Sequence, residues 1–129
     1  MRTIFSDVDG VILKQPESFL DLYKKVILNP FGDVIPESRD KLFKWYTEGH
    51  RIILTTGRPE HEHEALSKHL MTNGVYYHKL IMDCGSGIRY LINDIKPSHP
   101  DVQGAVGINL IRNKGLGEVE VWLEFLSRS

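Results

Sequence analysis

The sequence contains a single cysteine, Cys84, among its 129 residues. An internal disulfide is therefore excluded, and we expect a reducing, cytoplasmic environment. No apolar run is long enough to cross a bilayer, and the amino terminus leads directly into an apolar strand-like segment without the features of a secretory signal. The formal net charge of -1 gives no long-range attraction to nucleic acid or to an anionic membrane. We expect neither as a partner.

Internal repeats, low-complexity tracts and long linkers are also lacking. A chain of 129 residues can bury one sizeable core but not two, so we expect a single domain over residues 1–129. Apolar segments of strand length alternate with segments of helical periodicity. This alternation predicts an α/β fold with a Rossmann-like, mostly parallel sheet and helices on both faces. The expected strands are residues 3–6, 51–55, 79–82, 90–92 and 105–110, and the expected helices are residues 16–28, 36 to about 49, 59–72 and 116–126.

Two of these helices carry apolar residues at roughly helical spacing. Proline is favoured at the start of a helix and glycine just beyond its end, so we expect the second helix to begin at Pro36 and to close at Gly49. The apolar residues of the first helix are Phe19, Leu20, Leu22, Tyr23, Val26 and Ile27, and those expected to face inward from the second are Leu42, Phe43, Trp45 and Tyr46.

Two acidic residues, Asp7 and Asp9, follow the first expected strand and precede Gly10. Residues two apart in an extended backbone point to the same side, so both carboxylates can face one pocket. Their mutual repulsion falls if a divalent cation binds between them or if one of them holds a proton. Asp-x-Asp-Gly is also common in turns, where Asp accepts backbone hydrogen bonds. The rest of the chain must decide between a turn and a site.

Two further expected strands end in polar residues. The strand over residues 51–55 ends in Thr55-Thr56-Gly57-Arg58, and the strand over residues 90–92 ends in Asn93-Asp94. Ligands of open α/β sheets bind beyond the carboxyl ends of the strands. We therefore expect these groups to share one site with the first acidic pair.

Taken in order, these motifs resemble the haloacid dehalogenase-like superfamily of phosphohydrolases. Asp7-Val8-Asp9-Gly10-Val11 resembles its first motif, Thr56-Gly57-Arg58 its second and Ile92-Asn93-Asp94 its fourth. The motifs run from near residue 4 to residue 97, and the alternating pattern accounts for most of what remains. The resemblance implies a Rossmann-like sheet and a magnesium-dependent phosphatase that acts on a phosphate monoester through an aspartyl-phosphate intermediate.

The resemblance also implies roles for the acidic residues. Asp7 would be the nucleophile, and Asp9 would be the general acid and base. Asp7, Asp94 and the main-chain carbonyl of Asp9 would bind Mg²⁺, which neutralises charge between an anionic nucleophile and an anionic phosphate. Asn93 either orients Asp94, binds the metal through its amide oxygen or caps an Asx-turn.

Residues 55–58 would bind the phosphate. Thr56 would donate its hydroxyl to the phosphate oxygens, together with a backbone amide near Gly57. Thr55 or Thr56 could instead satisfy a backbone group at the end of the strand. Arg58 contacts the phosphate or the leaving group, or is a solvated residue at the start of a helix.

The resemblance fails at the third motif, where the superfamily has a lysine that steadies the nucleophile and the phosphate. The corresponding loop, residues 83–87, reads Asp-Cys-Gly-Ser-Gly and has no lysine. Lys96, Lys79 and Arg89 are the candidates to replace it, and we assign Lys96 because it follows a strand end already placed in the site. The Gly-Ser-Gly run is either an anion-binding nest or a flexible turn.

The gaps between the motifs are too short for a separate cap domain, so we expect a capless protein with an open site. An open site fits a macromolecular substrate or shielding by a partner subunit. The near-neutral charge favours a small phosphorylated metabolite, such as a phosphosugar, in a homo-oligomer. One alternative is a catalytically weak or dead module that binds phosphate or metal. A receiver-like phosphoacceptor domain is less favoured, because its aspartate should end a middle strand, where this chain has Thr55-Thr56.

Overall fold

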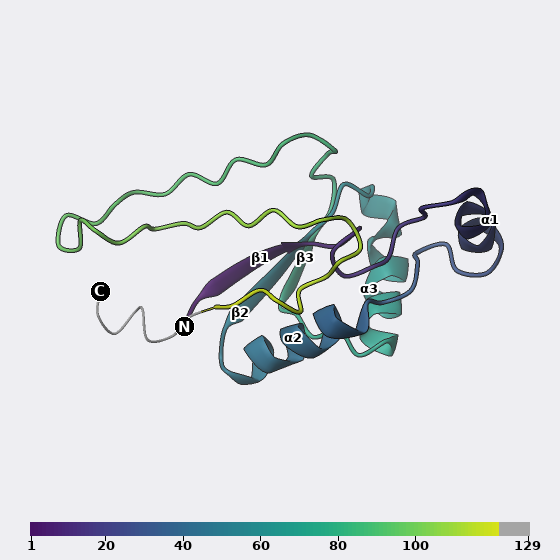
Figure 1. Cartoon of the computed structure of the whole chain (residues 1–129), viewed down its shortest axis with the longest axis horizontal. Helices are drawn as coiled ribbons and strands as arrows, with labels where there is room; N and C mark the ends of the chain where they lie inside the picture. Colours follow the sequence, from purple (N-terminus) through teal and green to yellow (C-terminus); the bar gives the residue numbers. More distant parts are fainter. Residues whose placement is uncertain (122–129) are drawn as a thin grey trace.

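A computed structural model of the chain describes residues 1–121. Within these residues a parallel sheet has the strand order β1-β2-β3, and the register aligns Asp7 with Thr55 and Thr55 with Ile81. The carboxyl ends of the strands therefore lie level with one another, and the α/β class is confirmed. The strands are β1 (Thr3–Asp7), β2 (Arg51–Thr55) and β3 (Lys79–Ile81), and the helical elements are α1 (Phe19–Ile27), α2 (Pro36–Thr47), the 3₁₀ turn η1 (Glu60–Glu62) and α3 (His63–Thr72) (Figure 1).

Local sequence signals set the ends of these helices. Helix α2 begins at Pro36, and beyond its end Gly49 has a φ of 89°, a left-handed conformation that glycine adopts without strain. Helix α1 begins later than predicted because Ser18 is its N-cap, and the Ser18 hydroxyl accepts a hydrogen bond of 3.1 Å from the Asp21 N–H. The predicted boundaries of α2 and of the strands β1, β2 and β3 are close to those observed.

The core lies on one face of the sheet. Ile52 and Leu54 of β2 are fully buried there, and the register places Ile4 of β1 beside them. Two crossovers that follow one direction along the sheet put α2 and α3 on the same side of it. On the opposite face Phe5 and Ile81 are 51% and 44% exposed, and the expected second layer of helices is not formed among the described residues.

Helix α2 buries fewer of its apolar residues than predicted. Leu42 and Trp45 are buried in the core as predicted, but Phe43 and Tyr46 are partly exposed. Both of these rings contact Tyr76 instead, with centroids 5.1 and 5.3 Å apart. The buried stripe of the helix is narrower than the four apolar residues suggest. The Phe43 and Tyr46 rings form a surface cluster with Tyr76.

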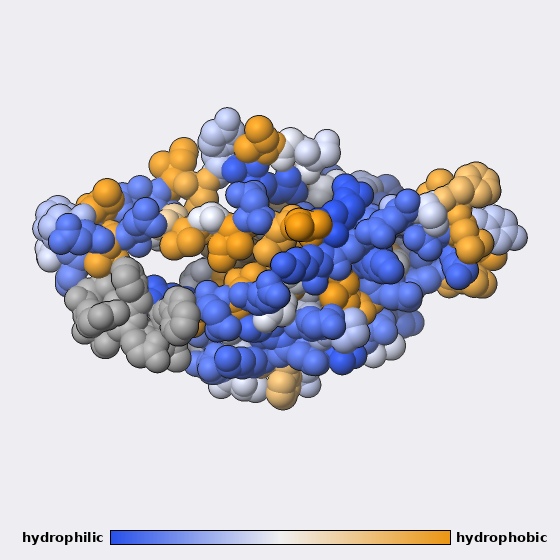
Figure 2. All heavy atoms as spheres, in the orientation of Figure 1, coloured by the Kyte–Doolittle hydropathy of each residue, from blue (hydrophilic) through white to orange (hydrophobic). Residues whose placement is uncertain are grey.

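Helix α1 projects from the body of the protein and buries none of its residues (Figure 1). Figure 2 shows apolar side chains gathered on this helix, among which Phe19 is 85% exposed. The helical spacing was therefore correct, but it did not imply packing against the sheet. No helix in the described part of the chain is both long enough and apolar enough to cross a membrane.

The segment from residue 86 to residue 111 leaves the body as two long arms, out and back (Figure 1). The predicted strands at residues 90–92 and 105–110 lie on these arms and are wrong, since neither belongs to the sheet. Ile92 is 90% exposed. An apolar run becomes a strand only when tertiary structure supplies a pairing partner. Residues 116–121 are not helical, and the rest of the helix expected at 116–126 lies outside the described residues.

Candidate functional site

Two carboxylates lie beyond the carboxyl end of β1. Asp7 is the last residue of the strand, and its side chain is 48% exposed. Val8 follows and is fully buried, which directs its neighbours Asp7 and Asp9 away from the core. Asp9 is less accessible, with a side chain that is 25% exposed. The pair thus consists of one accessible carboxylate and one that the protein encloses.

The Asp9 carboxylate is held by four hydrogen bonds. Its Oδ1 accepts from Arg58 Nε at 3.0 Å, from Arg58 Nη2 at 2.9 Å and from Gln15 Nε2 at 3.2 Å. Its Oδ2 accepts from the Thr56 hydroxyl at 2.8 Å. Charge-assisted hydrogen bonds of this kind are strong and directional, so Asp9 is fixed in one orientation beside Asp7.

The side chain of Arg58 binds two acidic residues. Besides the contacts with Asp9, its Nη1 lies 3.2 Å from Glu62 Oε1, and its guanidinium lies over the Phe31 ring at 5.1 Å. Burial alone would lower the pKa of Arg58, but the hydrogen bonds and charges of Asp9 and Glu62 outweigh it and raise this pKa above its usual value. In this structure Arg58 holds Asp9, whereas the sequence predicted contact with phosphate or solvent.

Thr56 is fully buried. Its hydroxyl donates to Asp9 and accepts a hydrogen bond of 3.2 Å from the Arg58 backbone N–H. The Thr56 side chain therefore orients Asp9, and its contact with phosphate stays a prediction. Thr55 pairs with Asp7 in the sheet register, so its side chain lies on the same face as that carboxylate.

The electrostatic environment of Asp7 has opposing components. Burial raises the pKa of Asp7 above its ordinary value, and the charge of Asp9 acts in the same direction. The hydrogen bond to the Val8 backbone and the positive charges of Arg89 and Arg112 oppose this rise without cancelling it. Two arginines therefore act on the candidate nucleophile, and Arg89 Nη2 lies 3.9 Å from Asp7 Oδ1.

The structure separates the three candidates for the missing lysine. Lys96, which the sequence favoured, lies on the exposed arms and pairs with Asp94 at 3.0 Å, with 71% of its side chain exposed. Lys79 is the first residue of β3 and therefore lies at the end of the strand opposite the acidic pair. Arg89 is the candidate that contacts Asp7. The assignment of Lys96 is not supported, because its strand did not form.

Asn93 and Asp94 also lie on the arms, because the strand expected at residues 90–92 did not form. They precede the tip of the arms, and a Cβ added to Gly104 on the returning arm would lie 2.6 Å from the Asp94 carbonyl oxygen. Among residues 1–121 there is no group of three or more His, Cys, Asp or Glu side chains arranged to hold a metal ion. Mg²⁺ at phosphate-transfer sites often takes only one or two carboxylates, together with water and phosphate. The accessible carboxylate of Asp7 fits such a partial ligand set.

The loop that replaces the third motif packs directly on the second. The Cys84 N–H donates to the Thr56 carbonyl at 3.0 Å, and the Asp83 N–H donates to the Arg58 carbonyl at 2.9 Å. A Cβ on Gly57 would lie 2.7 Å from the Gly85 carbonyl oxygen, closer than side chains tolerate. Glycine at position 57 is therefore required by the approach of two backbones, and not only by a ligand.

Three polar residues that the sequence patterns did not indicate lie against this site: Gln15, Arg112 and Asn113. Gln15 binds Asp9, and Asn113 binds the backbone of Gln15 through its side chain with a 2.7 Å contact. Asn113 has a φ of 69°, a conformation that asparagine adopts more readily than most residues. The Asn-Lys-Gly sequence at residues 113–115 was the available signal, and it indicates only a turn.

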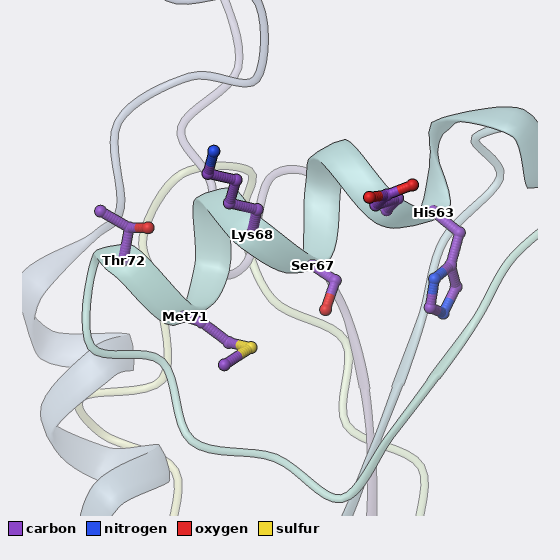
Figure 3. Close-up of a pocket in the computed structure, with 6 residues that line it drawn as sticks. His63, Ser67, Lys68, Met71 and Thr72 are labelled. Carbon is purple, nitrogen blue, oxygen red and sulfur yellow. The ribbon is translucent and has the colours of Figure 1, made fainter.

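Two hollows of the surface do not include the acidic pair. One of about 430 Å³ is lined by six residues of α3, including His63, Ser67 and Met71 (Figure 3). The other, of about 630 Å³, lies around the start of α1 and is lined by residues such as Pro16 and Phe19. The first is built from one helix alone, so neither its shape nor its residues suggest chemistry.

In comparisons with protein-family models, with curated protein sequences and with solved structures, nothing matched this chain.

Proposed function

We propose that this protein is a haloacid dehalogenase-like phosphatase that acts on a small phosphate monoester, with Asp7 as nucleophile and Asp9 as general acid and base. One observation carries the proposal. A half-exposed carboxylate at the end of a parallel strand stands beside a second carboxylate that four hydrogen bonds hold in place. Catalysis of phosphoryl transfer depends mainly on such positioning and on charge neutralisation.

The chemistry has two steps. An Asp7 oxygen forms a bond to phosphorus while the bond from phosphorus to the alcohol oxygen breaks, and Asp9 gives its proton to that oxygen. Water then attacks the phosphorus of the aspartyl phosphate, Asp9 takes the proton from the water, and phosphate and free Asp7 are released. Thr56 suits both steps, because a hydroxyl can donate to a charged Asp9 or accept from a protonated one.

Cations neutralise the negative charge of the reacting groups. Arg89 lies close enough to Asp7 to contact a phosphate bound there. Mg²⁺ bound by Asp7 and the main-chain carbonyl of Asp9 would supply further charge neutralisation. The proposal includes a Rossmann-like sheet, of which the parallel strands β1, β2 and β3 would form the core.

The accessible Asp7 supports an open, capless site, and the near-neutral charge of the chain supports a small phosphorylated metabolite, with a phosphosugar as an example of the class. One observation favours a second function, a module that binds phosphate without turnover. Arg58 donates two hydrogen bonds to Asp9, and these occupy the carboxyl group that would have to serve the leaving oxygen in catalysis.

A panel of phosphate monoesters, assayed for phosphate release with and without Mg²⁺, separates the two functions. We expect release that depends on Mg²⁺ in the wild-type protein and in Asp101→Asn, a control at an exposed aspartate. Asp7→Asn should release none, because an amide cannot form the acyl phosphate. Wild-type turnover in Asp7→Asn, with deamidation excluded, would reject the nucleophile. Phosphate binding without turnover in the wild type would favour the binding module.

A further inference from the structure

Asn113 connects the returning chain to the loop that follows β1. Its backbone N–H donates to the Gly10 carbonyl at 2.7 Å, and its side-chain Oδ1 accepts from the Gln15 N–H at 2.7 Å. Its Nδ2 donates to the Gln15 carbonyl and to Glu17 Oε1, both at 2.9 Å. The side-chain contacts span 96 to 98 residues of sequence and use every polar atom of the side chain.

These contacts reach both carboxylates of the candidate site. Through Gln15, whose Nε2 lies 3.2 Å from Asp9 Oδ1, Asn113 helps to fix Asp9. Through its backbone it fixes the preceding residue, Arg112, whose Cγ would lie 3.4 Å from a Cβ on Gly10. The positive charge of Arg112 acts to lower the pKa of Asp7, so the guanidinium is close enough to interact electrostatically with the nucleophile.

Arg112 differs from Arg58, the arginine of the second motif, in how its charge is used. Arg58 is held between two carboxylates, whereas in the described part of the chain no ion pair or hydrogen bond involves the side chain of Arg112, which is exposed. A guanidinium presents several N–H donors in a plane and binds phosphate oxygens in pairs. The side chain of Arg112 is therefore available to an anion that approaches Asp7.

We propose that Arg112 is a phosphate-binding residue of this site and that Asn113 is the positioning residue that holds it there. The inference rests on the proposed function, since it assumes that phosphate binds at Asp7. Under this inference Arg112, on the returning chain, and Arg89 together supply the positive charge that the third-motif lysine would provide.

Arg112→Met keeps most of the aliphatic stem and removes the charge. Lys114→Met is the matched control, because Lys114 is a nearby exposed cation that pairs with Glu118 at 3.0 Å. Titration calorimetry with inorganic phosphate in the presence of Mg²⁺ should show affinity about tenfold weaker for Arg112→Met and unchanged for Lys114→Met. In steady-state assays kcat/KM should fall about a hundredfold for Arg112→Met and by less than about twofold for the control.

The positioning role has its own test. Asn113→Gly keeps the left-handed backbone accessible but removes the side-chain hydrogen bonds, so the Gln15 amide should exchange faster with deuterium and phosphate affinity should fall. If Asn113 acts through Arg112, the double variant should bind phosphate no more weakly than Arg112→Met alone. Additive losses, or a lower Tm with unchanged phosphate affinity, would reduce Asn113 to a structural residue and overturn this part of the proposal.

The inference about Arg112 and the phosphatase proposal can each fail without the other. If Arg112→Met loses phosphate affinity in a protein that hydrolyses no ester, the inference stands and the phosphatase proposal falls. If Arg112→Met binds phosphate as tightly as the wild-type protein, the inference falls whether or not the wild type turns over. A wild-type protein that neither binds phosphate nor releases it contradicts both.

Discussion

Thr56→Val tests whether the buried Thr56 hydroxyl both stabilises the fold and orients Asp9. The substitution keeps the shape of the side chain and replaces the hydroxyl with a methyl group. That hydroxyl is fully buried, donates to Asp9 at 2.8 Å and accepts from the Arg58 N–H at 3.2 Å. A hydrogen bond to a charged group contributes about 1.5–3 kcal/mol. We therefore expect a loss of about 2 kcal/mol in the free energy of unfolding. If the same contact orients Asp9 for proton transfer, kcat should fall about 30-fold, since 1.36 kcal/mol corresponds to about tenfold in rate.

Urea unfolding and steady-state kinetics would measure the two effects, with Thr55→Val as the matched control on the neighbouring residue. Thr55 lies beside Asp7 rather than beneath Asp9, so its hydroxyl should affect KM more than kcat and change stability by less than about 0.5 kcal/mol. Unchanged stability and unchanged kcat in Thr56→Val would refute the reasoning. A lower stability with normal kcat would show that the hydroxyl supports the fold without orienting Asp9.

Three further predictions concern the groups around this site and the core. Gly57→Ala should lower both stability and activity, because its Cβ would lie 2.7 Å from a backbone oxygen, whereas Gly87→Ala meets nothing within 4 Å and should lower neither. Ser38→Ala should cost about 2–3 kcal/mol in urea unfolding, because the buried hydroxyl bonds two backbone groups at 2.6 and 2.9 Å, and an unchanged midpoint would contradict this. Burial lowers the pKa of His50, so its contribution to stability is fully present above its ordinary pKa of 6.5 and is lost as the pH falls below that value. The Tm of the wild-type protein should accordingly drop more between about pH 7.5 and about pH 5.5 than that of His50→Asn, and equal drops would exclude His50 as the cause.

Local patterns predicted the elements whose ends carry clear signals in the sequence. The strands at Thr3–Asp7 and Arg51–Thr55 and the helix at Pro36–Thr47 follow from apolar runs, a starting proline and a closing glycine. The same patterns placed Asp7 and Asp9 at the end of a strand. They could not show that Asp9 is the more enclosed of the two, because Arg58, which binds it, lies 49 residues further along the chain.

Long-range pairing is what the sequence left undetermined. The apolar run at residues 90–92 has strand-like composition, but whether it joins the sheet depends on β1, more than 80 residues earlier. The predicted roles of Asn93, Asp94 and Lys96 all depend on that one pairing, and without it the structure places the three residues on the arms. Arg112 and Asn113 were missed for the same reason, since nothing near them in the sequence indicates the loop that they contact.

The most direct test of the central claim is detection of the covalent intermediate. The wild-type protein, mixed with a phosphate ester that it hydrolyses and quenched in acid, should gain the mass of one phosphoryl group, and peptide mapping should place that group on Asp7. The same treatment of Asp7→Asn should give no adduct, while Asp101→Asn should behave as the wild type. Phosphate release without any adduct under conditions where such an intermediate accumulates, or an adduct on a residue other than Asp7, would contradict the account.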